Sequence, residues 1–182
     1  MNKMKEKTNS SKVVFKGKIL DVRKDGVILP NGKSEIREWI NHPGAACCIP
    51  IMPDGKIVLI KQYRYAVQKV MIELPAGKLD IGEEPEVCAR RELEEEIGYK
   101  TNKLKFLTII HPAIGFTNEK MWIYIAEDLE KTRQNLDNDE FLTLIPTDLE
   151  DALGMVWSGK ITDVKTMIGL LWADKMLKNK VT

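Results

Sequence analysis

The chain has 182 residues, of which 43% are hydrophobic and 30% are charged, and its formal net charge is +1. This size and composition suit one globular domain with a small appended layer. The near-neutral charge gives no electrostatic reason to expect a nucleic-acid partner. No stretch has the pattern of a membrane span or a signal peptide, so we also expect no membrane partner.

The cysteines favour a reducing compartment. Cys47, Cys48 and Cys88 form neither an even disulfide set nor a metal-ligand spacing. Because Cys47 and Cys48 are adjacent in an apolar run, we expect buried, reduced thiols there. We therefore expect a cytoplasmic protein.

The beginning of the chain shows strand and turn signals. Residues 1–12 are polar and lysine-rich, without an apolar centre, and are predicted to be a flexible tail. Strands are predicted at 13–22, 27–29 and 34–41, with turns at Lys24-Asp25-Gly26 and Pro30-Asn31-Gly32. Residues 13–43 should therefore form a small N-terminal antiparallel sheet.

The remainder, residues 44–182, mixes strand and helix patterns. Further strands are predicted at 45–52, 56–63, 70–74, 104–111, 121–126 and 141–145, and helices at 85–97, from about 147 to 156, and from 162 onward. The first two of these strands flank Pro53-Asp54-Gly55 and are predicted to pair with each other. This order predicts an α/β (α+β) fold with a mixed central sheet between helices.

The predicted helix from Pro85 to Ile97 has both ends marked. Pro85 suits the first turn, where its missing N–H costs nothing, and Gly98 suits a left-handed residue just past the end. Ala89, Leu93 and Ile97 recur at i, i+4 and i+8. This apolar stripe should pack on a core.

Three acids, Glu92, Glu95 and Glu96, share an adjoining face of this helix. Like charges at such spacings repel by about 0.2–0.5 kcal/mol per pair in an isolated helix. A hard divalent cation such as Mg²⁺ would reverse that sign, because it takes oxygen ligands. The alternative is a solvated acidic face, for which Arg90 and Arg91 could supply partners one turn away.

The spacing around this helix resembles a known pattern. Five residues separate Gly77 from Glu83, and seven more lead to the run Arg91–Tyr99. The segment resembles the Nudix box, G-x5-E-x7-R-E-U-x-E-E-x-G-U, at every defined position, which is far more specific than a lone glycine motif. Other stretches resemble the ADP-ribose pyrophosphatase branch of the Nudix hydrolases: Arg37-Glu38-Trp39, His42–Ala45, Gln62–Tyr65, Glu73–Asp80 and Gly159–Thr166.

The resemblance implies a fold, a reaction and an assembly. Residues 44–182 are expected to form a Nudix α/β/α sandwich. That branch cleaves the diphosphate of nucleoside diphosphate sugars with Mg²⁺, for which Mn²⁺ can substitute. Hydrolysis of ADP-ribose to AMP and ribose 5-phosphate is the leading expectation. The resemblance also implies a homodimer in which the N-terminal sheet is exchanged between subunits.

The same resemblance implies metal-site roles for individual residues. Glu92, Glu95 and Glu96 are expected to bind the metal and to be catalytic, together with the backbone carbonyl of Ala76. Support is expected from two neighbours, Glu83 orienting the loop and Arg91 bracing the glutamates.

The base and the phosphate contact are expected outside the box. Glu140 is the first expectation for the residue that aligns or deprotonates water, followed by Asp139 and then Asp137. An ordinary acidic turn is the alternative for each of them. Arg64 is expected to grip a phosphate, since guanidinium offers a forked geometry, with an ordinary surface arginine as the alternative.

Substrate recognition is the least constrained part of the sequence. Trp39 and Arg37 lie where the family clasps the base, and Glu119 is expected near the nucleoside or sugar; a core or dimer-contact tryptophan is the alternative. ADP-ribose-cleaving relatives commonly carry proline where this chain has Ile114, so GDP-mannose or a broader substrate range stays open. A non-catalytic nucleotide-sugar sensor is another alternative, whereas the charge disfavours an RNA-associated hydrolase.

Overall fold

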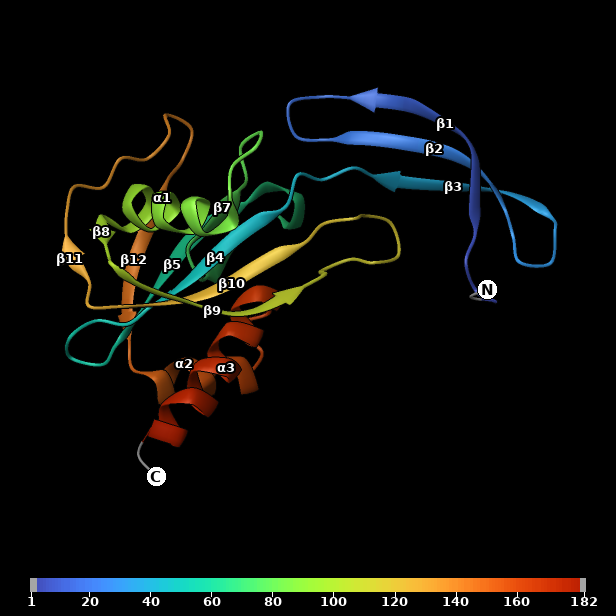
Figure 1. Cartoon of the computed structure of the whole chain (residues 1–182). Helices are drawn as coiled ribbons and strands as arrows, with labels where there is room; N and C mark the ends of the chain where they lie inside the picture. Colours follow the sequence, from blue (N-terminus) through green and yellow to red (C-terminus); the bar gives the residue numbers. More distant parts are fainter. Residues whose placement is uncertain (1–2, 181–182) are drawn as a thin grey trace. The chain divides into compact units, whose positions relative to one another are not determined.

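The computed structural model describes residues 3–180, which divide into two compact units (Figure 1). The smaller unit comprises the chain up to Pro43 together with Ala113–Lys120. The larger unit comprises Gly44–Pro112 and the chain from Met121 onward. The segment 113–120 thus belongs to the smaller unit, although residues of the larger unit precede and follow it in sequence.

The smaller unit is an antiparallel sheet in the order β1-β2-β3. Its strands are β1 (Lys7–Lys16), β2 (Asp21–Ile28) and β3 (Ser34–Ile40). The predicted turn between β2 and β3 is confirmed, because Gly32 has φ +84° and donates its N–H to the Leu29 carbonyl. The loop 113–120 joins this sheet through the Ile40 N–H, which donates to the Phe116 carbonyl at 2.8 Å.

The prediction of a flexible tail is wrong for residues 7–12, because β1 begins at Lys7. All ten residues of β1 are exposed, so the strand carries none of the alternating hydrophobicity that sequence reasoning requires. Backbone pairing with β2 defines it instead. Residues 1 and 2 of the predicted tail lie outside the described residues.

The predicted turn at Lys24-Asp25-Gly26 is also wrong, since these residues lie within β2. Gly26 faces a register shift in β1: a Cβ there would lie 2.5 Å from Asn9 Oδ1 and 2.6 Å from Ser10 Oγ. The glycine therefore marks a crowded bulge within paired strands, which a sequence pattern does not distinguish from a turn.

The larger unit contains a mixed sheet in the order β7-β4-β10-β9. Strand β4 (Ala45–Pro50) runs parallel to β10 (Met121–Glu127). Strands β7 (Ala76–Lys78) and β9 (Lys103–Ile110) flank this pair antiparallel. The predicted mixed sheet is confirmed.

A second, antiparallel sheet has the order β12-β5-β6. Its strands are β5 (Ile57–Arg64), β6 (Lys69–Glu73) and β12 (Leu142–Thr147), and short elements elsewhere are η1 (Tyr65–Val67), β8 (Tyr99–Lys100) and β11 (Glu130–Lys131). The predicted pairing of 45–52 with 56–63 is wrong for β4 and β5, which belong to different sheets. The two segments meet beside the turn, through an antiparallel Ile51–Ile57 bridge and the Met52 N–H, which donates to the Lys56 carbonyl at 2.8 Å. Both strands begin with buried apolar runs, which do not specify a partner.

The side chains of β4 alternate between two cores and so define the layers. Ala46 and Cys48 pack with helix α1 (Pro85–Ile97), whereas Cys47 and Ile49 pack with α2 (Leu149–Trp157) and α3 (Val164–Lys180). The sheets thus lie between α1 on one side and α2 and α3 on the other (Figure 1). The predicted α/β/α sandwich is confirmed. Within residues 3–180, no helix is long and apolar enough to span a bilayer.

The cysteines agree with the sequence prediction. Cys47, Cys48 and Cys88 are buried free thiols. Burial raises the pKa of Cys47 and of Cys88 to about 12. These thiols therefore remain protonated and unreactive at neutral pH.

Candidate metal and phosphate site

Helix α1 presents the acidic residues on a fixed frame. Pro85 occupies its first turn, and Gly98, at φ +69°, donates its N–H to the carbonyls of Glu94 and Leu93. The stripe predicted to face the core is confirmed, because Ala89, Leu93 and Ile97 are buried. Packing of this stripe fixes the rotation of the helix and hence the direction of its acidic face.

Two of the acidic side chains are withdrawn from solvent. Glu92 is 9% exposed and Glu96 is 2% exposed. Glu96 accepts a hydrogen bond from the Ala76 backbone N–H at 2.8 Å. Burial, followed by repulsion from Glu92, raises the pKa of Glu96 to about 8, and burial also raises the pKa of Glu92. A nearby cation would reverse both shifts.

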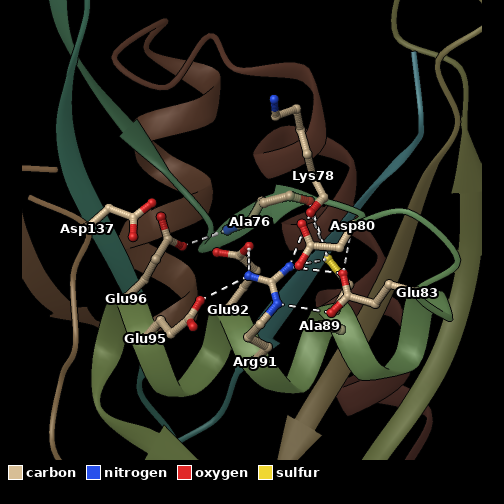
Figure 2. A network of polar contacts seen from close by, with 12 residues as sticks. Ala76, Lys78, Asp80, Glu83, Ala89, Arg91, Glu92, Glu95, Glu96 and Asp137 are labelled. Atoms are coloured by element: carbon tan, nitrogen blue, oxygen red, sulfur yellow. Dashed lines mark hydrogen bonds and ion pairs between the residues drawn. The ribbon is translucent and has the colours of Figure 1, made fainter. Parts of the chain in front are cut away.

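Arg91 connects the helix to the preceding loop (Figure 2). Its guanidinium donates to Glu83 at 2.9 and 3.0 Å, to Glu92 at 2.6 Å and to Glu95 at 2.9 Å. The bonds from Arg91 lower the pKa of Glu83 to about 2. Glu83 also accepts the Asp80 backbone N–H at 2.9 Å, so the loop and the acidic face are held together.

Gly77 allows the loop strand to approach the helix closely. A Cβ at Gly77 would lie 1.8 Å from Glu92 Oε1 and 2.0 Å from the Glu92 carboxyl carbon. Real side chains do not approach so closely, so a side chain at this position would have to displace the Glu92 carboxylate. Strand β7 can therefore place its backbone directly against the Glu92 carboxylate.

The loop after β11 brings further carboxylates to this region. Burial is the main cause of the raised pKa values of Glu92 and Glu96, and the charge of Glu140 adds to both shifts. The Glu140 N–H donates to the Asp137 carbonyl at 3.0 Å. In Figure 2 the Asp137 side chain points toward the Glu96 carboxylate; Asp137 and Asp139 are both exposed.

Arg64 belongs to a buried ion network that the sequence analysis did not identify. It donates to both oxygens of Glu73, at 2.7 and 2.9 Å, and Lys165 donates to Glu73 at 2.5 Å and to Asp163 at 3.0 Å. Glu73 and Lys165 are 3% and 6% exposed. They are 92 residues apart, so no periodicity relates them, although both lie in stretches quoted above for the family resemblance.

The other predicted substrate contacts lie in the smaller unit and have partners there. Arg37 donates to Glu6 at 2.6 and 3.0 Å, and the Trp39 indole N–H donates to Asp25 at 2.9 Å. The third predicted contact, Glu119, lies on the loop 113–120, where its N–H donates to Thr117 Oγ1 at 3.1 Å; on the same loop, Ile114 is 81% exposed.

The donor chemistry of α1 fits a divalent cation. In residues 3–180, no three His, Cys, Asp or Glu side chains already converge as a metal site, and Arg91 occupies oxygens of Glu92 and Glu95. The buried Glu96 and the half-buried Glu95 nevertheless offer hard oxygen donors beside Glu92. Mg²⁺ prefers such donors and binds through few carboxylates together with substrate phosphates.

Comparison with known families identifies the class of protein. A model described as "NUDIX domain" matches residues 41–163, and a model described as "Nucleoside diphosphate sugar hydrolase N-terminal domain" matches residues 6–40. The chain therefore belongs to the Nudix hydrolase family, a family that generally uses a divalent metal. The family resemblance found in the sequence is confirmed.

Several relatives share most of the chain. An ADP-ribose pyrophosphatase of Bacillus subtilis (strain 168) is 42% identical over 168 residues, 91% of each chain. A methanol dehydrogenase activator of Bacillus methanolicus is 41% identical over 164 residues, 89% of each. A GDP-mannose pyrophosphatase of Cronobacter sakazakii is 33% identical over 154 residues, 80% of this chain and 78% of that one.

A solved structure supports the fold. The crystal structure of an ADP compounds hydrolase superposes with a TM-score of 0.87 and covers 97% of this chain and 96% of its own. Because the two sequences are 24% identical, this likeness shows the fold alone.

Proposed function

We propose that this protein hydrolyses the diphosphate linkage of nucleoside diphosphate sugars, with ADP-ribose as the leading substrate and AMP and ribose 5-phosphate as products. The observation that carries the proposal is the pair of buried carboxylates, Glu92 and Glu96, whose pKa values are raised in the absence of a cation. The relative named ADP-ribose pyrophosphatase, 42% identical, supports the choice of substrate.

Glu92, Glu95 and Glu96, with the Ala76 carbonyl, are the groups proposed to bind Mg²⁺, or Mn²⁺ in its place. A bound cation supplies charge neutralisation on diphosphate oxygens and lowers the pKa of bound water. The Ala76 N–H orients the Glu96 carboxylate toward this role, and Arg91 restrains Glu92 and Glu95.

The remaining steps belong to the chain's own side chains. Glu140, next Asp139 and then Asp137, is proposed to align the attacking water and accept its proton. Arg64 is proposed to donate to the diphosphate while Glu73 fixes its orientation through the two bonds described above. The carboxylate and Arg64 would contribute by holding the water and the diphosphate in reactive positions, so that the reaction becomes effectively intramolecular.

Base and sugar selection are assigned to the smaller unit. Trp39 is proposed to stack on the base, Arg37 to contact it, and Glu119 to contact the nucleoside or terminal sugar. GDP-mannose is the competing substrate, since a GDP-mannose pyrophosphatase is 33% identical and Ile114 departs from the proline common in relatives that cleave ADP-ribose.

A substrate panel tests the proposal. ADP-ribose, GDP-mannose and other nucleotide sugars would be incubated with Mg²⁺ or Mn²⁺, and released monophosphates detected through a coupled phosphatase. Fastest turnover of ADP-ribose supports the leading substrate, and fastest turnover of GDP-mannose selects the alternative. Binding without cleavage would indicate a nucleotide-sugar sensor, and absence of any turnover would defeat the hydrolase proposal.

A second candidate function comes from the relative named methanol dehydrogenase activator, which is 41% identical across 89% of this chain. We propose testing whether this protein also activates a methanol dehydrogenase. Purified dehydrogenase would be assayed with the wild-type protein and with Glu96→Gln. Activation by the wild type alone would attribute the effect to hydrolysis, and no activation by either would dismiss the candidate.

We propose a homodimer that exchanges the N-terminal sheet, residues 13–43, and a cytoplasmic location, which suits the free buried thiols. Light scattering after size-exclusion chromatography measures the assembly, and a monomer at micromolar concentration would contradict the dimer. Cell fractionation checks the location.

A further inference from the structure

The segment Thr132–Asn135 is docked on the carboxyl end of the catalytic helix α1. The Thr132 N–H donates to the Gly98 carbonyl at 2.8 Å, and the Asn135 N–H donates to the Glu95 carbonyl at 3.0 Å. Between them, the Gln134 side-chain amide donates to the Glu96 carbonyl at 2.6 Å. The last carbonyls of a helix have no partner within the helix, so this segment satisfies groups that otherwise require water.

Gly98 permits this docking by its lack of a side chain. A Cβ on Gly98 would lie 2.9 Å from the Gln134 backbone nitrogen and 3.4 Å from the Gln134 Cα. Both are backbone atoms, so a side chain there could be accommodated only by moving the segment. The segment therefore packs directly against the end of the helix.

The docking relates two groups of carboxylates. The backbone carbonyls of Glu95 and Glu96 accept hydrogen bonds from the segment, and their side chains belong to the acidic face of α1. Asp137 follows Gln134 by three residues, which span at most roughly 10 Å. Glu140 follows by six, and its N–H donates to the Asp137 carbonyl at 3.0 Å, so the two acids belong to one turn. The position of the acidic loop is thus set from the helix that carries the other carboxylates.

We propose that Gln134 is a positioning residue, whose donation to the Glu96 carbonyl sets the placement of the acidic loop 137–140 over the glutamates of α1. This inference rests on the proposed function, in which that loop supplies the water-aligning carboxylate. Gln134 is an exposed residue whose backbone packs against Gly98, and the polar end of its side chain is the group that donates to the Glu96 carbonyl. Its contribution is therefore a directed hydrogen bond rather than a packed side chain.

Comparing four side chains at position 134 separates the effect of the hydrogen bond from the effect of side-chain shape. Glutamine and lysine can both donate to a carbonyl, and lysine also suits the negative end of the helix dipole. Glutamate has the shape of glutamine but, when ionised, only accepts and so repels the carbonyl. Alanine neither donates a hydrogen bond to the carbonyl nor keeps the shape of glutamine. A bonding role predicts turnover in the order wild type, Gln134→Lys, Gln134→Ala, Gln134→Glu, whereas a space-filling role predicts that Gln134→Glu is closest to wild type.

The kinetic test is turnover of the preferred nucleotide sugar at saturating Mg²⁺. Gln134→Ala should lower kcat by about ten- to a hundred-fold, the scale associated with misplacing a reacting group by about 1 Å. KM should stay within about twofold, because the amide bonds a helix carbonyl and not the substrate. The pH profile of kcat should shift in Gln134→Ala, because the loop carboxylate meets a changed electrostatic field. An unchanged kcat and pH profile would overturn the inference.

A glycine pair tests the docking independently of Gln134. Gly98→Ala places a methyl group against the segment, whereas Gly55→Ala, at φ +85° and with no atom within 4 Å of its Cβ, imposes the same backbone strain in open space. Gly98→Ala should lower kcat at least tenfold more than Gly55→Ala. Equal effects would mean that only backbone strain matters, and would contradict the docking role.

Amide hydrogen exchange measures the docking of the segment without requiring enzymatic activity. Gln134→Ala should speed exchange in residues 136–141 while strand β10 keeps its protection. If the wild type hydrolyses no nucleotide sugar but the exchange result holds, the proposed function fails and the docking survives. If the wild type is active and neither exchange nor kcat changes in Gln134→Ala, the positioning role is wrong.

Discussion

The Ala76 backbone N–H donates to Glu96 Oε2 at 2.8 Å, joining the residue before the motif glycine to a carboxylate twenty residues later. Glu96 is almost fully buried, and burial raises its pKa to about 8. An ionised carboxylate in this position requires compensation that a single neutral donor supplies only in part. A divalent cation, which the family generally uses, is the compensation that we propose for Glu96.

Glu96→Gln should lower turnover by about 10²–10³-fold while the protein stays folded, because loss of a metal ligand removes several kcal/mol of charge stabilisation. The amide oxygen can still accept the Ala76 N–H, so the fold is preserved. Steady-state kinetics and circular dichroism measure the two effects. The matched control is Glu94→Gln, an exposed neutralisation on the same helix, which should keep nearly full activity. Near-wild-type turnover in Glu96→Gln would remove this residue from the metal shell.

The apo protein should lose stability as the pH rises from about 5 to 8. The folded state keeps a proton on Glu96 up to a pKa of about 8, whereas the unfolded chain releases it near 4.5. Over that window the folded state binds more protons, so the free energy of unfolding falls with rising pH. The raised pKa of Glu92 acts in the same direction.

Urea denaturation in the presence of a chelator measures this slope. Glu96→Gln should flatten it and Glu94→Gln should leave it unchanged. Added Mg²⁺ should stabilise the wild type more at pH 8 than at pH 6, because the carboxylates must be ionised to bind it. A free energy of unfolding that rises between pH 5 and 8 without metal would contradict the assignment of a protonated Glu96.

Gly77→Ala should abolish most activity, because its Cβ would lie 1.8 Å from Glu92 Oε1 and would displace that carboxylate. Because the overlapping atoms are the flexible end of the Glu92 side chain, the free energy of unfolding should fall by less than the about 1–3 kcal/mol that is usual for overpacking. Gly154→Ala is the control, since its helical Cβ meets no atom within 4 Å. Kinetics and urea denaturation of both variants give the comparison, and an active Gly77→Ala would show that Glu92 can move without loss.

The sequence predicted the acidic helix well, because its caps, apolar stripe and glutamates are all local features. Gly98, Leu93 and Glu96 could each be placed by spacing within one element. The pairing of Glu73 with Lys165 could not be predicted from spacing, because the two residues are 92 positions apart and only the fold brings them together. Residues 7–12 of strand β1 were missed because the strand has no buried face, and a pattern of hydrophobicity cannot reveal a strand segment that lacks one.

Lys165→Met should lower the free energy of unfolding by about 3–5 kcal/mol, the typical cost of removing one partner of a buried ion pair. Lys165 and Glu73 are 6% and 3% exposed, and burial raises the pKa of Glu73 while bonds from Arg64 and Lys165 bring it below its ordinary value. Without Lys165, the Glu73 charge keeps only Arg64, whose side chain is 42% exposed. Lys178→Met, in an exposed pair with Asp174, is the control and should change stability by less than about 0.5 kcal/mol.

The double variant Glu73→Gln, Lys165→Met should lose less stability than the sum of the losses in the two single variants, because neither member of the buried pair is left with an unpaired charge. Additive losses in urea denaturation would mean that the pair does not act as a unit.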